Sequence, residues 1–454
     1  MKEIRILGLS KLGYGFPMDS LERGMKENPH VLAVDGGSTD LGPFPLAGRL
    51  PLPLIEKTIL RDFKIELRAA RERRIPYIVG SVGIAGNNEQ LEYFARRFKE
   101  VAKEAGYHFR MAIISSEIDR EYLKHRLRTA PEGIEDLTHQ GNLTVEHVER
   151  SSKVVAQMGH QPIVQALREG AEMVVCGRAC DNALFAALPI LQGFDPGLSL
   201  HAGKILECGA IAADPGSSSD IMIGTIREDH FLIAPTNPNR RATVRSIAEH
   251  SLYEQRDPYT IQQPGGYVDT REARYEPVDQ RTVKVFGSRW VPVSCKVKLE
   301  GAGFVGYRSF IIGSVRDEAV IQNLDYLLEI AQARTRDNFP DIPKEAYHLI
   351  FHVYGRDGTL GALEPLKSKG DPHEVGLLIE AVGKTQEIAT TVCAFAKSII
   401  LHAGFEGRKS TAGNLAVPFS PDLINAGEVA EFTIYHLLPV KDPGELFPIR
   451  FEEV

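Results

Sequence analysis

Two aspartates and a serine follow an apolar run and could carry out acid–base or metal chemistry. Residues 35–40 read DGGSTD and come directly after the run VLAV at 31–34. We expect Asp35 and Asp40 to act as acid and base or to ligate a divalent cation such as Mg²⁺, with Ser38 beside the substrate. The alternative is that Asp40 caps a turn formed by the two glycines.

A second loop, at residues 80–88 (GSVGIAGNN), lies between an apolar run and a helical pattern. A glycine-rich turn at a helix N-terminus presents backbone N–H groups to an anion. We therefore expect Ser81, Gly83 and Asn87 to bind a phosphate or carboxylate. The alternative is that Asn87 or Asn88 only caps the helix. The spacing of the glycines does not match the dinucleotide fingerprint.

A third segment, residues 176–182 (CGRACDN), places an arginine next to a strand end. Arg178 is expected to bind a carboxylate or phosphate with its guanidinium. Asp181 could be the partner of Arg178, a helix cap or a catalytic base. The cysteines of this segment and Cys208 do not have the spacing of zinc or iron–sulfur ligands, so buried thiols are expected.

Two further segments carry charged candidates. Residues 201–209 (HAGKILECG) contain Glu207, which could be a catalytic carboxylate at a helix end. Residues 406–414 (EGRKSTAGN) form a basic, polar loop in which Arg408 and Asn414 could contact an anionic ligand. The alternative for this loop is a solvated stretch near a helix C-terminus, where basic residues are common.

Alternating periodicities predict how these loops are positioned. Short apolar runs, interpreted as strands, alternate with amphipathic stretches such as 59–74 and 90–105, interpreted as helices. This predicts an α/β fold with a doubly wound, mostly parallel, Rossmann-like sheet in the N-terminal half. In such sheets, functional loops follow the carboxyl ends of the strands. The apolar runs are Ile4–Leu9, Val31–Val34, Tyr77–Val79, Met111–Ile114, Val154–Ala156 and Met173–Cys176.

The periodicity changes twice along the chain and suggests three regions. Residues 1–219 are expected to form an α/β domain with the strand-end loops. Residues 220–340 are expected to form a β-rich region packed on it, because β-rich runs there are separated by Gly, Asn and Pro. Residues 341–454 are expected to form a small C-terminal α+β domain.

Composition limits the classes of function. The chain has 454 residues, 53 Lys plus Arg, 60 Asp plus Glu and a net charge of −7, which argues against nucleic acid as the main partner. Five cysteines are too few for a disulfide scaffold. No apolar run reaches the roughly 18–20 residues of a membrane span. We expect a cytoplasmic enzyme with a small anionic substrate, forming a homo-oligomer, with a small partner subunit as a further option.

The quoted motifs resemble a known family, the acyclic terpene utilisation AtuA family. The resemblance rests on DGGSTD, on PIVQALREGAEMVVCGRACDNALFAA through HAGKILECGA, and on the C-terminal run from HEVGLLIEAVGKTQEIA to HAGFEGRKSTAGNLAVPFSPDLI with its YHLLP tail. It implies a place in the bacterial breakdown of branched acids and terpenes as CoA thioesters. It also implies a lyase or hydratase role rather than hydride transfer.

The resemblance and the residues together favour a lyase or hydratase acting on a branched carboxylic acid or its CoA thioester. Such a reaction needs a carboxylate base, donors for a developing oxyanion and an anion clamp. Two alternatives remain open: a hydrolase or isomerase of a small polar carboxylate without CoA, and a non-catalytic subunit of a multi-chain enzyme. The candidates for the base are Asp35, Asp40 and Asp181. The backbone amides of residues 80–86 are the candidate oxyanion donors, and Arg178 or Arg408 is the candidate anion clamp.

Overall fold

The chain divides into two compact units. We analysed a computed structural model that describes residues 2–48, 52–138, 141–366, 370 and 372–454. The first unit comprises Met1–Gly303 and Phe432–Val454, and the second comprises Phe304–Glu431. The chain passes between the units within β15 (Lys296–Val315) and β18 (Leu423–Pro439).

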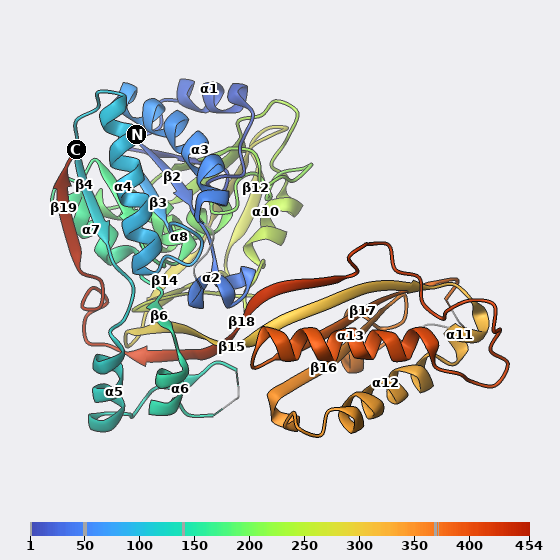
Figure 1. Ribbon diagram of the computed structural model, residues 1–454. Helices are drawn as coiled ribbons and strands as arrows, with labels where there is room; N and C mark the ends of the chain where they lie inside the picture. Colours follow the sequence, from blue (N-terminus) through green and yellow to red (C-terminus); the bar gives the residue numbers. More distant parts are fainter. Residues whose placement is uncertain (1, 49–51, 139–140, 367–369, 371) are drawn as a thin grey trace. The chain divides into compact units, whose positions relative to one another are not determined.

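A mixed sheet forms the centre of the first unit (Figure 1). Within the described residues, five neighbouring strands are parallel, in the order β1-β2-β3-β7-β4. Antiparallel strands extend the sheet beyond β1 and beyond β4. The sheet strands are β1 (Ile4–Gly8), β2 (Val31–Asp35), β3 (Tyr77–Gly80), β4 (Arg110–Ile114), β7 (Met173–Cys176), β8 (Met222–Ile226), β9 (His230–Pro235), β12 (Arg274–Pro277), β13 (Val283–Phe286) and β19 (Ile449–Glu453).

Helices cover both faces of this sheet. Successive residues of a strand point to opposite faces, so Ile6 and Ala33 belong to one core while Leu7 and Val34 belong to the other. The first core includes α7 (His160–Arg168), α8 (Asp181–Leu191) and α9 (Pro196–Leu206). The second includes α1 (Met18–Lys26), α3 (Leu52–Arg73) and α4 (Asn88–Glu104).

Short elements complete the first unit. A separate three-stranded sheet is made of β10 (Thr260–Gln263), β11 (Gly266–Asp269) and β14 (Arg289–Pro292). The remaining elements are α2 (Phe44–Ala47), α5 (Arg120–Thr129), α6 (Val145–Arg150), α10 (Val244–Ser251), β5 (Glu135–Asp136) and β6 (Lys153–Ala156).

The α/β class is confirmed, and two finer expectations need correction. The sheet is mixed rather than mostly parallel, because β8 returns antiparallel to β1. The strand β6 pairs antiparallel with β15 and not with the parallel strands. Residues 222–315 carry the strands β8 to β15, and Met222, Phe231 and Ile233 belong to the same core as α8 and α9.

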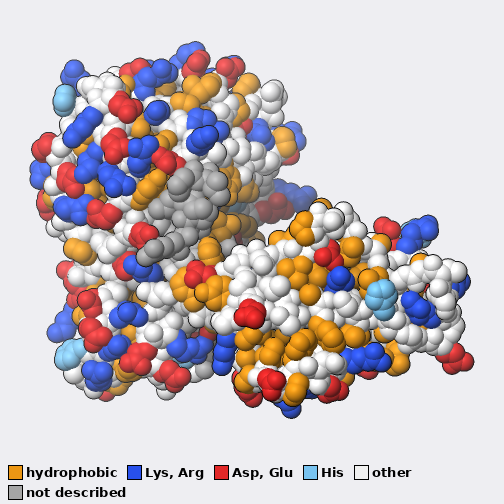
Figure 2. Space-filling view, viewed as in Figure 1, with side chains coloured by type: hydrophobic (Ala, Val, Ile, Leu, Met, Phe, Trp, Pro, Cys, Tyr) orange, Lys and Arg blue, Asp and Glu red, His pale blue; other side chains and the backbone are white. Residues whose placement is uncertain are grey.

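The second unit has a sheet with helices packed on it. Its strands are β16 (Tyr347–Tyr354), β17 (Val375–Gly383) and parts of β15 and β18. The helices are α11 (Glu318–Gln322), α12 (Leu324–Asn338) and α13 (Gln386–His402), and Leu327 and Val392 share a core with Leu349 and Leu377 of the sheet. Figure 2 shows hydrophobic side chains gathered on the surface around α12 and α13.

The second unit does not coincide with the expected C-terminal domain at 341–454. It begins at Phe304, and the chain from Phe432 onward belongs to the first unit. The reason is β19, which pairs antiparallel with β4 at the edge of the large sheet (Figure 1). Within the described part of the chain, every helix is too short or too polar to cross a membrane.

A buried carboxyl on α3 makes the stability of the first unit depend on pH. Glu66 is fully buried and accepts a hydrogen bond from Tyr77 Oη. Burial raises the pKa of Glu66 from 4.5 to about 8, even though Tyr77 acts to lower it. Between these pH values the folded state holds a proton that the unfolded state has released. The free energy of unfolding therefore falls as pH rises, by up to about 1.4 kcal/mol per pH unit.

We expect Glu66→Gln to remove this slope, because a glutamine does not titrate. Urea unfolding of the wild type and the variant between pH 4.5 and pH 8 measures it. Glu72→Gln is the matched control: it lies on the same helix, its side chain is 66% exposed, and it should keep the wild-type slope. Equal slopes in Glu66→Gln and wild type would contradict the prediction.

Candidate functional site

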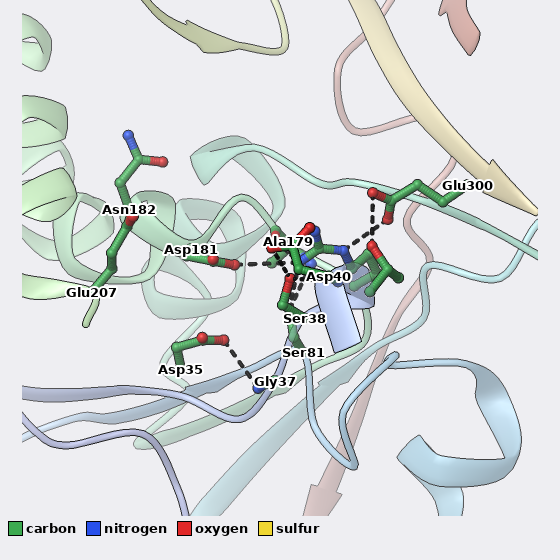
Figure 3. Close-up of polar contacts among 12 residues, drawn as sticks. Asp35, Gly37, Ser38, Asp40, Ser81, Ala179, Asp181, Asn182, Glu207 and Glu300 are labelled. Atoms are coloured by element: carbon green, nitrogen blue, oxygen red, sulfur yellow. Dashed lines mark hydrogen bonds and ion pairs between the residues drawn. The ribbon is translucent and has the colours of Figure 1, made fainter. Parts of the chain in front are cut away.

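The ends of four parallel strands bring charged and polar side chains to one edge of the large sheet. Lys11 follows β1, Asp35 ends β2, Ser81 follows β3 and Arg178 follows β7. Because parallel strands present their carboxyl ends at the same edge, these residues meet although they are far apart in sequence. Figure 3 shows Asp35 and Ser81 at this edge. Asp35, Ser81 and Arg178, from the strand-end loops of 35–40, 80–88 and 176–182, lie near one another in the structure.

Asp35 and Lys11 form a buried ion pair. The Asp35 side chain is fully buried, and its Oδ2 lies 3.0 Å from Lys11 Nζ. The backbone N–H of Gly37 donates to Asp35 Oδ1 at 3.2 Å. The charge of Asp35 raises the pKa of Lys11 above its usual value, against the effect of burial. The pair therefore places a fixed negative and a fixed positive charge beside each other.

Asp181 is the first residue of α8 and lies close to both of these charges. Its Oδ1 is 3.3 Å from Arg178 Nη1, and its side chain is 20% exposed. Burial raises its pKa well above the usual value, and the charges of Asp35 and Glu207 raise it further. Asp181 therefore holds a proton more readily than an ordinary aspartate and keeps contact with solvent.

Glu207 is the third carboxylate of the group and follows the last residue of α9. Lys204 Nζ donates to Glu207 Oε1 at 2.5 Å, and both side chains are buried. Burial raises the pKa of Glu207, and the charge of Asp35 acts in the same direction. Asp35, Asp181 and Glu207 thus repel one another electrostatically, and two lysines and an arginine balance their charge.

Arg178 is buried, and its guanidinium is bound by groups of the protein, among them Asp181, which the sequence offered as a partner. Its Nε donates to Glu300 Oε2 at 2.8 Å, and its Nη1 donates to Ser81 Oγ at 3.3 Å (Figure 3). Glu300 also bonds Lys298 Nζ at 2.8 Å and accepts from Thr39 Oγ1 at 3.0 Å. Burial acts to raise the pKa of Glu300, but the charges of Arg178 and Lys298 outweigh it and lower the pKa to about 2.

The amides of the glycine-rich loop are mostly used inside the protein. Those of Ser81 and Val82 donate to the carbonyls of Gly177 and Cys176. Those of Ala85 and Gly86 both donate to Gln90 Oε1 at 2.9 Å. These four amides therefore do not form the expected anion site, because each already has a partner.

Two candidates from that loop have structural roles. Asn87 caps α4 by accepting from the Gln90 N–H, which confirms the alternative interpretation of this residue. Gly83 has φ +76°, and a Cβ there would lie 2.7 Å from Gln90 Cβ. Its place in the turn therefore requires glycine. Ligand binding by Gly83 stays a prediction.

Asp35 and Asp40 do not form a metal site suited to Mg²⁺. Asp40 is exposed and accepts a hydrogen bond from Ser38 Oγ at 2.5 Å, while Ser38 accepts from the Asp40 N–H and caps the short helix Thr39–Leu41. Asp35 is already held by the ammonium of Lys11. Within the described residues, no group of three or more His, Cys, Asp or Glu could hold a metal ion. We therefore derive no step through a metal.

The thiols and the histidine of the third and fourth segments lie in the interior. Cys176, Cys180 and Cys208 are buried free thiols, as expected from their spacing. His201 bonds Ser288 Oγ at 2.6 Å and Ser251 Oγ at 2.8 Å. Burial lowers the pKa of His201 to about 3, so this ring is neutral and structural.

Arg408 and Asn414 belong to the second unit and bond each other. Arg408 Nε donates to Asn414 Oδ1 at 2.8 Å. Asn414 Nδ2 donates to the carbonyls of Ile400 at 2.9 Å and Ala403 at 2.8 Å. Asn414 therefore satisfies carbonyls at the C-terminus of α13, as the alternative interpretation of this loop implies. A ligand contact by either residue stays a prediction.

Sequence reasoning missed Lys11 and Glu300. Lys11 follows the first apolar run by two residues, and the strand-end rule used for Asp35 could have found it. Glu300 lies inside the long strand β15 and meets Arg178 across 122 residues. Its only signal was a carboxylate in an otherwise apolar and basic strand, which does not identify a partner.

Comparison with known proteins gives one match. The sequence matches the family described as acyclic terpene utilisation family protein AtuA over residues 53–430. The matched range includes Arg178, Asp181, Glu207 and Glu300 and starts after Lys11 and Asp35. Neither the curated proteins nor the solved structures contain a match.

Proposed function

Because this chain belongs to the acyclic terpene utilisation (AtuA) family, we propose that it is a lyase or hydratase acting on a branched carboxylic acid or its CoA thioester. The observation that carries the proposal is Asp181. Of the three clustered carboxylates it is the most exposed, at 20% of its side chain against 0% for Asp35 and 5% for Glu207. A carboxyl with a raised pKa and access to solvent suits general acid–base catalysis near neutral pH.

In the proposed reaction, Asp181 takes the proton from the carbon next to the substrate carbonyl. The electron pair of that C–H bond forms the C=C bond, and the hydroxyl on the neighbouring carbon leaves with its bonding pair. The hydroxyl takes the proton back from Asp181 and departs as water, so the carboxylate is restored. Hydration is the same sequence in reverse. A free acid and a thioester both offer the carbonyl that makes this proton acidic.

The surroundings of Asp181 set its proton affinity. Burial and the charges of Asp35 and Glu207 raise its pKa well above the usual value, although the charge of Arg178 acts to lower it. The side chain of Lys11 is 22% exposed, and its charge would stabilise negative charge that develops on the substrate oxygen. Arg178 is a positioning residue here, because it acts through Asp181 and Ser81.

A substrate panel tests the proposal. The purified chain is incubated with branched enoyl and hydroxyacyl thioesters and with the corresponding free acids, with and without Mg²⁺. We expect the chain to hydrate at least one member reversibly. The loss of enoyl absorbance measures this hydration. If no member is converted and none raises the melting temperature, the proposed function is wrong.

A further inference from the structure

A basic pocket lies in the first unit, apart from the carboxylate cluster. Its volume is about 730 Å³, and Asp214, Asn239, Arg240, Arg241 and Arg281 are among its lining residues. Three arginines and one aspartate are thus among its lining residues. The lining carries a surplus of positive charge in a chain whose net charge is −7.

The three arginines are held in place by the protein. Arg240 Nε is 2.6 Å from Asp220 Oδ2, and Asp220 is fully buried behind it. Arg281 Nε donates to the carbonyl of Arg240 at 2.9 Å, and its Nη2 donates to that of Pro235 at 3.0 Å. Bonds to carbonyl oxygens orient the guanidinium of Arg281 without neutralising its charge.

Arg241 is the most accessible of the three. Its side chain is 61% exposed, and its Nη2 lies 2.8 Å from Asp214 Oδ2, which is 49% exposed. An exposed pair of this kind is worth little by itself, because solvent screens it. An incoming anion can therefore compete with Asp214 for Arg241 at small cost.

The pocket opens at the same edge of the large sheet as the carboxylate cluster. Gly8 pairs with Met222, Met222 with Pro235, and Val283 with Ile233, so β1, the start of β8, the end of β9 and the start of β13 reach one edge. Arg240 and Arg241 follow β9, and Arg281 precedes β13. With strands spaced about 4.8 Å apart, three spacings separate β1 from β13, or about 14 Å.

We propose that this pocket binds the phosphate groups of a small ligand. Guanidinium groups bind phosphate oxygens in pairs of parallel hydrogen bonds, and a phosphate matches the surplus charge. Its place at the same edge of the sheet suits a ligand that carries its phosphates at one end and the reacting carbonyl at the other. This last step rests on the proposed function, whereas phosphate binding itself does not.

Calorimetric titration of the full chain with pyrophosphate and with a nucleoside diphosphate tests the proposal. We expect the wild type to bind at least one of them, and Arg241→Ala to weaken binding about tenfold or more, which corresponds to about 1.4 kcal/mol. Asp214→Asn should strengthen binding, because it removes the carboxylate that competes for Arg241. A gain in affinity cannot come from a misfolded protein.

Arg245→Ala is the matched control. Arg245 lies on α10 four residues after Arg241, is 87% exposed and pairs with Glu249, so its replacement removes the same charge without changing a residue that lines the pocket. It should bind as the wild type does. Tighter binding of the nucleoside diphosphate than of pyrophosphate would support a nucleotide-like carrier, and the reverse order would exclude one.

Two results would contradict phosphate binding by this pocket. One is that neither probe binds to the wild type, and the other is that wild type and Arg241→Ala bind the probes equally well. Failure of the proposed function is distinguishable from this. Asp181→Asn should bind both probes normally, because Asp181 does not line the pocket. If no member of the substrate panel is converted but the probes still bind in a way that depends on Arg241, the proposed reaction is wrong and the proposed phosphate site stands.

Discussion

Asp181→Asn is expected to lower kcat/KM about 10²–10⁴-fold on any substrate that the wild type converts. Asparagine keeps the size and polarity of the side chain but cannot exchange a proton. Steady-state kinetics on the converted member of the panel measures the effect. In the wild type, kcat/KM should rise with pH through a pKa above that of an ordinary aspartate, because burial and the charges of Asp35 and Glu207 favour the protonated form.

The matched control for this change is Asp229→Asn. Asp229 is 82% exposed in the turn between β8 and β9, and its replacement should leave the kinetics unchanged. If Asp181→Asn retains wild-type kcat/KM, or if both variants lose activity to the same degree, Asp181 is not the proton carrier.

Glu300→Ala is expected to lower the free energy of unfolding by about 3–5 kcal/mol. The variant removes the nearer of the two carboxylate partners of the buried Arg178 guanidinium, and Lys298 loses the same partner. Thr39 Oγ1 also loses its acceptor. Urea unfolding at neutral pH, followed by circular dichroism, measures the loss.

A double-mutant cycle separates the ion pair from the other effects of this change. Arg178→Met combined with Glu300→Ala should cost less than the sum of the two single variants, because removing both charges leaves neither unpaired. Additive losses would contradict a coupled pair.

The pH dependence of Glu300 has a definite sign. Its pKa is about 2 in the folded chain and near 4.5 in the unfolded chain. Its contribution is therefore fully present above pH 4.5 and is lost as pH falls toward 2. The difference in stability between wild type and Glu300→Ala should shrink over that range.

Local pattern predicted the elements of the fold better than their partners. All six apolar runs became strands, and the helical patterns at 59–74 and 90–105 lie within or close to α3 and α4. The pairing of Lys153–Ala156 with β15 was not predictable, because a buried run does not record which strand lies beside it. The same holds for β19, which completes the sheet from the far end of the chain.

The candidate site was predictable where the strand-end rule applies. Asp35, Ser81 and Arg178 meet because each follows or ends a parallel strand, and Asp181 and Glu207 join them from the helices α8 and α9. Glu300 could not be inferred, because its contact with Arg178 depends on the path of β15. The sequence suggested Asp181 as a partner of Arg178, and the structure adds Glu300 and Ser81.

Exchange of the substrate proton with heavy water tests the central claim most directly. The converted substrate is incubated in D₂O with wild type and with Asp181→Asn, and mass spectrometry records deuterium at the carbon next to the carbonyl. We predict incorporation with the wild type and at least about 100-fold slower incorporation with the variant. Equal rates of incorporation would show that another group moves the proton and would contradict the role of Asp181.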